Sequence, residues 1–377
     1  MDFLKRCWAE IDLDALDFNL ESIKAQCPDK EIIAVMKANA YGHSDVICAK
    51  EYYRLGVRRF AVSNFHEAER VREIIGDSKC FLLVFGYIGE EHFGGILQHG
   101  LTATAGSVEF AEKLNGFAVS RNAKIPVNIA VDTGMTRVGV RTAEEVSRIA
   151  ALKNLEITGM YSHFAVSDMT DAANVEFTQK QYEKFSRLAK SMNVPLHIHN
   201  SGGIAFYPDM QADWIRPGVI LYGLSPNTAV ENPLELRQVM TLKSVIDQLK
   251  VVPKGVDVGY GRTYTTDSEQ VLALVPVGYA DGYSRALSGR GFVAVNGVLC
   301  PIRGRVCMDQ IMIDVTGANA RLGDEVKLYS GDFAETSIDR IADVLGTIGY
   351  EVVCNVSARV PRVAVRKGEI VEVVNER

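Results

Sequence analysis

The sequence of 377 residues lacks several features that would assign it to a protein class at once. Its seven cysteines are scattered and contain no Cys-x-x-Cys pair, which argues against a disulfide framework and against a zinc site. This cysteine usage is typical of the reducing cytoplasm. No apolar run approaches the roughly 18 residues of a membrane helix, and we expect neither a signal peptide nor a membrane partner. The net charge of -6 argues against nucleic-acid binding, which needs a basic stripe.

The remaining composition is that of an ordinary soluble globular protein, with 47% hydrophobic and 23% charged residues. No internal repeat of fixed period and no low-complexity tract is present. The length allows two domains, one of which has room to be a barrel of about 250 residues.

Strand-like and helix-like patterns alternate between residues 12 and 232. About eight such units predict a parallel sheet closed into a (β/α)8 barrel, with residues 218–221 as the last strand. An open doubly wound sheet is the alternative, but it would carry a Gly-rich phosphate turn after its first strand, and none is present. After about Pro233 the runs become short and β-rich, with a hairpin signal at Asn296-Gly297 and one helix near 338–345. This part predicts a second, mostly β domain.

Lys37 follows directly after an apolar run at residues 32–36, which is typical of a buried strand. Burial lowers the pKa of a lysine because it disfavours the ammonium form. A neutral amine at a strand end suits Schiff-base chemistry with an aldehyde cofactor. The alternative is a lysine whose ammonium group reaches out to solvent from the strand end.

Other polar side chains also follow predicted strands, where a barrel collects its functional residues. They are Tyr41, the segment 132–137, His163, Asn200 and Ser201, while Arg216 directly precedes the last predicted strand. A phosphate site commonly forms after the last two strands, and there Ser201 offers a hydroxyl while Gly218 and Val219 offer amides. Taken singly, these residues have structural explanations, as a helix cap, a core histidine or surface ion pairs. Together they match the needs of pyridoxal 5'-phosphate.

The motifs in which these residues stand resemble those of bacterial alanine racemases, in the same order and over nearly the whole chain. The matching segments are 34–43, 132–140, 161–164, 200–201, 215–218, 222–223, 258–261, 277–282, 304–310, 349–352 and 359–362. The resemblance implies a (β/α)8 barrel at residues 12–232, and a β-rich domain made of residues 1–11 and 233–377. It also implies a head-to-tail homodimer with shared active sites, which supplies D-alanine for peptidoglycan from an amino-acid substrate.

The resemblance further implies a two-base mechanism, with Lys37 on one face of the cofactor and Tyr260 of the partner subunit on the other. A free phenol has a pKa of about 10, so we expect cationic His163 and Arg216 to favour its phenolate form. Arg216 would contact the pyridine nitrogen and leave it unprotonated, because arginine keeps its proton. The expected cofactor-binding residues are Lys37, Tyr41, His163, Asn200, Ser201, Arg216, Gly218, Val219 and Tyr350, and those for the substrate are Arg137 and Met308.

One position departs from the family pattern. Many members carry a carbamylated lysine two residues before the Asp-Thr-Gly-Met motif, where it orients the arginine of that motif, and this sequence has Ala130 there. Tyr350 favours alanine, because relatives that prefer serine carry asparagine at the matching position. A serine or broad-specificity racemase is therefore the first alternative. A decarboxylase of similar architecture would place a carboxylate where Arg216 stands, and a barrel-only regulatory protein would lack Tyr260.

Overall fold

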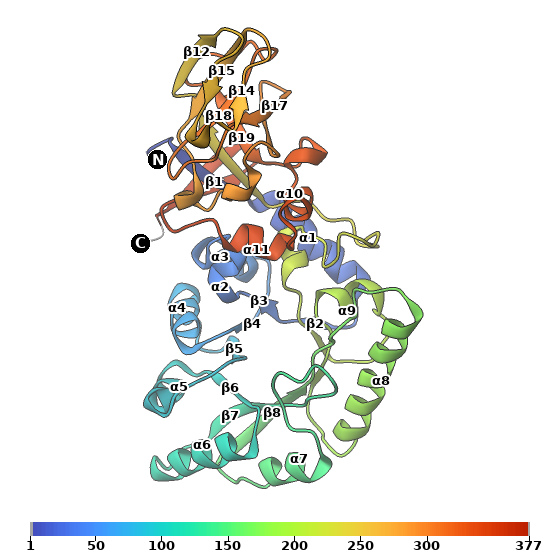
Figure 1. Ribbon diagram of the computed structural model, residues 1–377. Helices are drawn as coiled ribbons and strands as arrows, with labels where there is room; N and C mark the ends of the chain where they lie inside the picture. Colours follow the sequence, from blue (N-terminus) through green and yellow to red (C-terminus); the bar gives the residue numbers. More distant parts are fainter. Residues whose placement is uncertain (1–2, 376–377) are drawn as a thin grey trace.

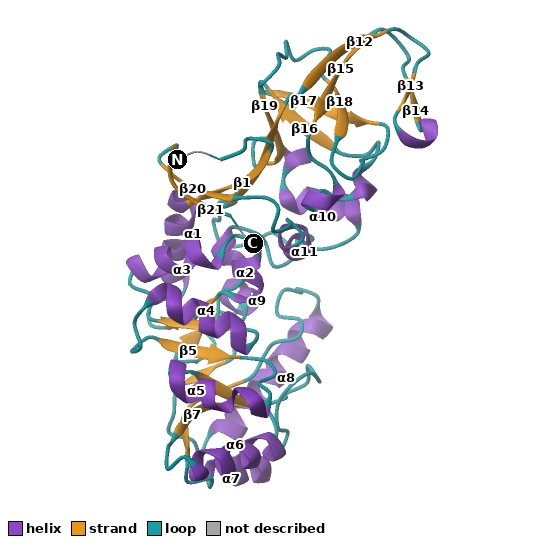
Figure 2. Ribbon diagram, turned by 90° about the vertical axis from the view of Figure 1, so that its left-hand side faces the viewer, coloured by secondary structure: helices purple, strands orange, loops and turns teal. Residues whose placement is uncertain are grey.

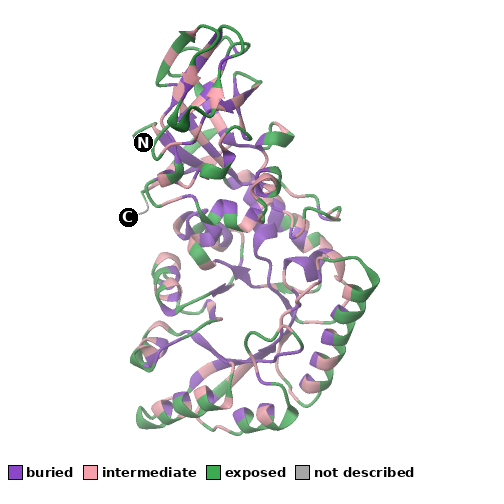
Figure 3. Cartoon of the chain, viewed as in Figure 1, coloured by how far each residue is buried: buried purple, intermediate pink, exposed green. Residues whose placement is uncertain are grey.

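The computed structural model describes residues 3–375, which form a ring of strands and helices below a mostly β region (Figure 1). Short apolar runs become the strands of the ring, and amphipathic segments become the helices around it. Buried residues line the strands and the inner faces of the helices, and exposed residues lie on the outer faces (Figure 3). None of the helices between residues 3 and 375 combines the length and apolar character that crossing a bilayer requires.

The ring is a closed parallel barrel. Seven strands pair in chain order: β3 (Ala34–Val35), β4 (Arg59–Val62), β5 (Phe81–Val84), β6 (Thr102–Ala105), β7 (Ile125–Ala130), β8 (Leu155–Tyr161) and β9 (Leu196–His197). The eighth, β10 (Trp214–Ile215), pairs with β2 (Glu31–Ile32), which runs into β3. Backbone bonds from Asp213 N to Leu196 O (2.9 Å) and from Ile33 N to Ile215 O (2.9 Å) close the ring. The predicted barrel is confirmed.

The expected eighth strand at residues 218–221 is wrong. The last strand is β10, and Val219–Tyr222 forms the short 3-10 helix η2. An apolar run of this length does not distinguish strand from helix by its periodicity, and Pro217 has no N–H with which to continue a ladder. Because the strand ends earlier, Arg216 lies just after it and not before it.

The barrel helices alternate with the strands and cover them from outside. They are α1 (Leu13–Gln26), α3 (Asp45–Arg54), α4 (Phe65–Ile75), η1 (Glu90–His92), α5 (Phe93–His99), α6 (Val108–Ser120), α7 (Ala143–Ala150), α8 (Ala172–Ala189) and α9 (Ser201–Phe206), while the short element α2 (Lys37–Tyr41) follows β3 at the end of the barrel. Asp12 caps α1, because its carboxylate accepts hydrogen bonds from the amides of Asp14 and Ala15.

The β region is built on one ten-stranded sheet of order β12-β15-β18-β17-β16-β19-β11-β1-β20-β21. Its strands are β1 (Cys7–Asp12), β11 (Met240–Val245), β12 (Gln248–Val252), β15 (Gln270–Val275), β16 (Phe292–Val295), β17 (Val298–Arg303), β18 (Ile311–Asp314), β19 (Glu325–Tyr329), β20 (Arg362–Arg366) and β21 (Glu369–Val374). The predicted Asn296-Gly297 turn joins β16 to β17, with positive φ at both residues. The first strand, β1, lies between β11 and β20, so both ends of the described chain meet in this sheet.

Smaller elements complete the β region. They are the hairpin β13 (Asp257–Val258) and β14 (Tyr264–Thr265), the 3-10 turns η3 (Tyr260–Arg262), η4 (Tyr279–Asp281), η5 (Arg285–Leu287) and η6 (Ala334–Thr336), and the helices α10 (Ile338–Leu345) and α11 (Gly349–Cys354). The hairpin stands at the far edge of the region, away from the barrel, while α11 lies next to α2 (Figure 2). The β region therefore touches the barrel mouth through α11 and not through the hairpin.

Candidate active site

A cavity of about 350 Å³ lies at the carboxyl ends of the barrel strands. Most of the residues singled out in the sequence line it: Lys37, Tyr41, Arg137, His163, Asn200, Ser201, Arg216, Gly218 and Tyr350. Val219 lies behind this surface with its side chain fully buried. Tyr260 and Met308 are elsewhere in the chain. The named lining residues thus come from the ends of five barrel strands and from α11.

The turn that carries Lys37 and Tyr41 is left-handed. Ala38, Asn39, Ala40 and Tyr41 all have φ between 52° and 54°. A residue with a side chain in this region costs about 1–2 kcal/mol, so neighbouring groups must hold the turn in place. No propensity in the sequence predicts such a run, which explains why a simple turn was expected here.

Hydrogen bonds to neighbouring elements help to hold this turn. Glu67 of α4 accepts from the Ala38 amide (2.8 Å), and the side chain of Asn39 accepts from the Asp45 amide (2.7 Å). Arg362 donates from Nε to the Gly42 carbonyl (2.9 Å). Gly42 is required at its position, because a Cβ there would collide with the Val353 carbonyl of α11. Barrel and β region therefore fix the lysine's position together.

Lys37 itself is half-buried at the cavity wall, with Nζ 5.7 Å from the centre of the Tyr41 ring. Burial lowers its pKa, and the nearby positive charge of Arg137 lowers the pKa further. The expectation of a lysine with a depressed pKa is confirmed. Such an amine carries a larger neutral fraction than a solvent-exposed lysine, and the neutral form is the nucleophile.

Small polar groups converge on the side of the cavity near Tyr41. The Gly218 amide donates to Ser201 Oγ (3.1 Å), and the Tyr41 and Tyr350 ring centres are 6.0 Å apart. A Cβ on Gly218 would stand 2.5 Å from Tyr41 Oη, so only glycine keeps this space open. Burial raises the pKa of both phenols, which keeps them neutral hydrogen-bond donors. The group is an uncharged cup suited to a phosphate.

Arg216 is the fixed cation of the cavity, with a side chain that is almost completely buried. Its Nη1 donates to His197 Nδ1 (2.9 Å) and to the His197 carbonyl (2.9 Å), and its Nη2 donates to the Ser162 carbonyl (2.7 Å). Burial lowers the pKa of Arg216 to about 10, so it stays charged near neutral pH. Within residues 3–375 no partner is recorded for its Nε, which leaves one N–H for a bound molecule.

The expectation of a cationic His163 is wrong. Burial lowers its pKa well below the ordinary value, and the positive charge of Arg216 acts in the same direction. Its Nδ1 lies 3.2 Å from Arg216 Nη2, and a guanidinium can only donate, so Nδ1 carries the lone pair. His163 is therefore neutral, and Arg216 is the positive charge on this side of the cavity.

Two residues of this network were not expected from the sequence. His197 accepts from Arg216 and, through Nε2, contacts Asn128 Oδ1 (2.8 Å) inside the barrel. Burial lowers the pKa of His197 well below its ordinary value, so it is neutral as well. His197 could have been noticed as the last residue of strand β9. The sequence pattern alone, however, does not distinguish a functional polar residue inside a barrel from a structural one.

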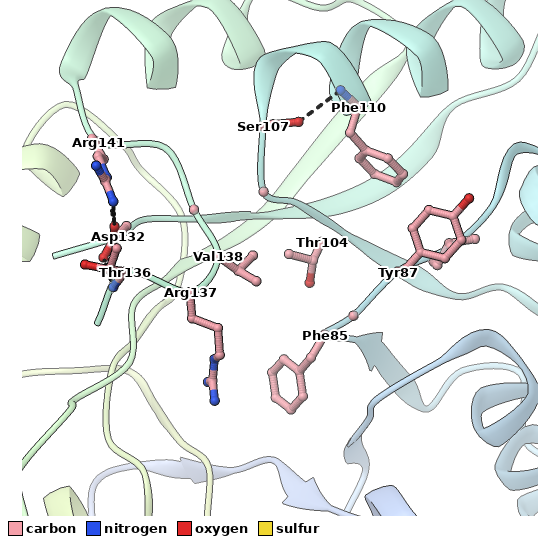
Figure 4. Close-up of a pocket in the computed structure, with 14 residues that line it drawn as sticks. Phe85, Tyr87, Thr104, Ser107, Phe110, Asp132, Thr136, Arg137, Val138 and Arg141 are labelled. Carbon is pink, nitrogen blue, oxygen red and sulfur yellow. Dashed lines mark hydrogen bonds and ion pairs between the residues drawn. The ribbon is translucent and has the colours of Figure 1, made fainter. Parts of the chain in front are cut away.

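Arg137 lies at the open side of the cavity, in the loop after β7. It is exposed, and in the described part of the chain no hydrogen bond or ion pair of its side chain is recorded. In Figure 4 its guanidinium lies beside the ring of Phe85. A second hollow, of about 460 Å³, shares Arg137 and Phe85 with the first.

Tyr260 and Met308 belong to a different surface. They line a hollow of about 470 Å³ in the β region, together with Tyr279 and Arg305. Tyr260 is 72% exposed and Met308 53% exposed. The chain therefore does not bring these two residues to its own Lys37.

Comparisons with known proteins agree with this architecture. Residues 11–226 match the family model "Alanine racemase, N-terminal domain", and residues 239–364 match "Alanine racemase, C-terminal domain". The alanine racemase 1 of Clostridium acetobutylicum is 38% identical, over 99% of this chain and 98% of that protein. The solved alanine racemase of Clostridium difficile superposes with a TM-score of 0.92 at 36% identity, over 100% of both chains.

A more distant solved relative is informative about ligands. The structure titled alanine racemase from Bartonella henselae with covalently bound pyridoxal phosphate has a TM-score of 0.85 and 28% identity, over 96% of this chain and 99% of that one. The fold and the cavity define a racemase of the barrel-plus-β-domain class, an isomerase. Within that class, the chain belongs to the alanine racemase family.

Proposed function

We propose that the protein interconverts L-alanine and D-alanine with pyridoxal 5'-phosphate as cofactor, in the cytoplasm, and so supplies D-alanine for peptidoglycan. The observation that carries this proposal is one cavity that joins Lys37, the cup of Tyr41 and Ser201, and the guanidinium of Arg216. A relative with covalently bound pyridoxal phosphate supports the choice of cofactor.

The residues present fit this cofactor. The cavity has an amine for its aldehyde in Lys37, and the space left by Gly218 beside Tyr41 and Ser201 for its phosphate. The unpartnered N–H of Arg216 suits its pyridine nitrogen, a pure acceptor when unprotonated. When bound, the cofactor supplies an aldehyde carbon and an electron sink next to the substrate's α-carbon.

Lys37 is the first of the two acid–base groups in this proposal. Its lowered pKa favours the neutral amine, so Nζ can take a proton from the α-carbon on its own side. The second group is Tyr260 of the partner subunit, on the opposite side. Arg216, the charged group at this end of the cavity, would favour the phenolate form of that tyrosine. Because Arg216 keeps its own proton, the pyridine nitrogen stays unprotonated, which restrains side reactions such as transamination.

The position of Tyr260 supports a head-to-tail homodimer. The residue is 72% exposed in a hairpin at the far edge of the β region, away from the barrel of its own chain (Figure 2). Met308 shares its hollow. A second copy of the chain would place both residues over the cavity that holds Lys37, where the Met308 backbone would assist Arg137.

For the substrate, we propose that Arg137 binds the carboxylate, because its guanidinium has no recorded partner and borders the cavity. His163 and Asn200 would line the cofactor, with Val219 behind its phosphate. Tyr350 at the cavity wall favours the small side chain of alanine over that of serine. A serine or broad-specificity racemase is the second candidate. Arg216 disfavours a decarboxylase, which would need a carboxylate at this position.

The test is chiral analysis of the products formed from L-alanine and from L-serine by purified protein with added pyridoxal phosphate. We expect L-alanine to reach an equal mixture of both enantiomers, and L-serine to react far more slowly. Protein from which the cofactor has been removed is the control. Equal rates for both substrates would support the second candidate, and loss of carbon dioxide without D-alanine would contradict the proposal.

A further inference from the structure

Arg137 lies in the loop after strand β7, and backbone hydrogen bonds join the two ends of this loop. The loop leaves the strand at Asp132 and returns at Val140, where Asp132 N donates to Val140 O (2.9 Å) and Val140 N donates to Ala130 O (3.0 Å). Arg137 lies in the second half of this loop. Since residue 130 is alanine, no lysine reaches up from the strand to hold the arginine.

The carboxylate of Asp132 organises the inside of this loop. Its Oδ1 accepts from the Gly134 amide (3.0 Å) and from the Thr136 amide (2.9 Å). Thr136 has a φ of 58°, which is unusual for a β-branched residue. The hydrogen bond to Asp132 therefore fixes an unfavourable conformation in the residue directly before Arg137.

Arg141 approaches the same carboxylate from beyond the loop. Its Nε and Nη2 both lie 2.8 Å from Asp132 Oδ2, while the Asp132 side chain is only 4% exposed. Burial alone would raise the pKa of Asp132, but the amides of Thr136 and Gly134 and the charge of Arg141 outweigh it and lower the pKa. In Figure 4, Arg141 points at Asp132, and Arg137 extends away from this ion pair.

The other side-chain hydrogen bonds recorded for this loop lie at its beginning. Lys184 donates to the Asp132 carbonyl (3.0 Å), and Thr133 is bonded to Ser162 (2.8 Å) and to Gln181 (3.2 Å). Among the recorded side-chain hydrogen bonds of the described chain, those of Asp132 are the ones that reach the amide next to Arg137. The Asp132 carboxylate, paired with Arg141, thus holds the backbone directly before Arg137.

We propose that Arg141 and Asp132 are positioning residues that aim Arg137 at the substrate carboxylate, in place of a lysine at position 130. The inference rests on the proposed role of Arg137 as the carboxylate-binding group. In this inference, the groups that orient Arg137 belong to the loop region itself and not to strand β7.

The test compares Arg141→Met, Arg141→Lys and Arg148→Met in the holoenzyme. Arg148 is the matched control, because it pairs with Glu112 at 2.9 Å and is 56% exposed, against 58% for Arg141. A misplaced binding group costs on the order of tenfold to a hundredfold, so we expect Arg141→Met to raise KM for L-alanine by about this factor and to lower kcat less. Arg141→Lys should recover part of the loss, and Arg148→Met should change nothing.

A binding measurement separates this role from general damage. Acetate, a carboxylate without an amino group, should bind Arg141→Met about tenfold more weakly by calorimetry, while the absorption spectrum of the bound cofactor and the melting temperature stay unchanged. If Arg141→Met unfolds, Asp132→Asn is the second variant, since it keeps the oxygen that accepts the two amides and loses the charge. It should show the same rise in KM.

A double variant decides whether the effect passes through Arg137. The Arg137→Met/Arg141→Met protein should have the KM of Arg137→Met alone. Additive effects, or a KM of Arg141→Met equal to that of Arg148→Met, would overturn the positioning role while Arg137 keeps its own. If Arg137→Met itself leaves KM and acetate binding unchanged, the proposed carboxylate site fails, and the inference fails with it.

Discussion

The two groups proposed as acid–base partners lie in opposite surroundings. Lys37 lines a cavity of about 350 Å³ on a left-handed turn, and burial lowers its pKa. Tyr260 is 72% exposed in a small hairpin at the edge of the β region. In the proposed function, the cavity of one chain would be the cofactor-binding half of the site. The other half, the base Tyr260, would come from another copy of the chain.

The largest effect on activity is expected when Lys37, the buried acid–base group, is removed. Lys37→Ala should retain no covalently bound cofactor and should lose racemisation by at least about a thousandfold, because neither the nucleophile nor the first base remains. The absorption spectrum and a chiral assay measure the two losses. Lys50→Ala, which removes an exposed ion pair with Glu372, is the control. Residual activity near that of the control would show that another amine anchors the cofactor.

Removal of the phenol of Tyr260, the exposed acid–base group, should have a smaller and more selective effect on activity. Tyr260→Phe should bind the cofactor normally and lose about a hundredfold to a thousandfold in racemisation, because one face of the substrate lacks its base. Lys37 should still exchange the α-hydrogen of one enantiomer with deuterium oxide.

Mass spectrometry of recovered alanine measures this exchange, and Tyr264→Phe in the same hairpin is the control, since the partner recorded for its hydroxyl within residues 3–375 is Gln270. Equal exchange of both enantiomers by Tyr260→Phe would contradict the assignment of two faces to two bases.

Mixing the two inactive variants tests whether the halves come from different chains. A mixed dimer of Lys37→Ala and Tyr260→Phe has one site with both changes and one site with neither. After random exchange half of the dimers are mixed, so about a quarter of the native activity should return. Size-exclusion chromatography and mass spectrometry verify the exchange. If exchange is complete and no activity returns, both groups must come from one chain.

The sequence predicts the cavity residues of the barrel well, for a physical reason. The carboxyl ends of parallel strands meet at one face of a barrel, so polar residues that follow apolar runs must come together. Lys37, His163 and Asn200 were found in this way, and all three line the cavity. The site roles of these residues stay predictions until they are tested.

What the sequence did not predict depends on long-range contacts. The left-handed turn at Ala38–Tyr41 is held by Glu67 and by Arg362, which is far along the chain. The charge of His163 depends on its burial beside Arg216, and its protonation was therefore predicted wrongly. The end of the last strand depends on Pro217, where an apolar run continues as a 3-10 turn. Local pattern carries none of this information.

The smallest expected effect concerns stability, and it tests the surroundings of Lys37 directly. In the cofactor-free protein its pKa is lowered from 10.5 by burial first and by Arg137 second. Below the folded pKa the lysine is charged in both states, and the folded state carries the full cost of burying that charge. As the pH rises through the folded pKa toward 10.5, the folded amine is already neutral while the unfolded one is still charged, so this cost falls and stability rises.

We therefore expect cofactor-free Lys37→Met to be more stable than the unchanged protein near neutral pH, with an advantage that shrinks as the pH rises. The change cannot exceed about 1.4 kcal/mol per pH unit, because a single proton is involved. Urea unfolding between about pH 7 and about pH 10 measures it, and the difference between the two proteins cancels the other titrating groups. If the difference in the free energy of unfolding between Lys37→Met and the unchanged protein did not vary with pH, Lys37 would be as well solvated as the exposed Tyr260. The two groups would then differ only in their position in the molecule.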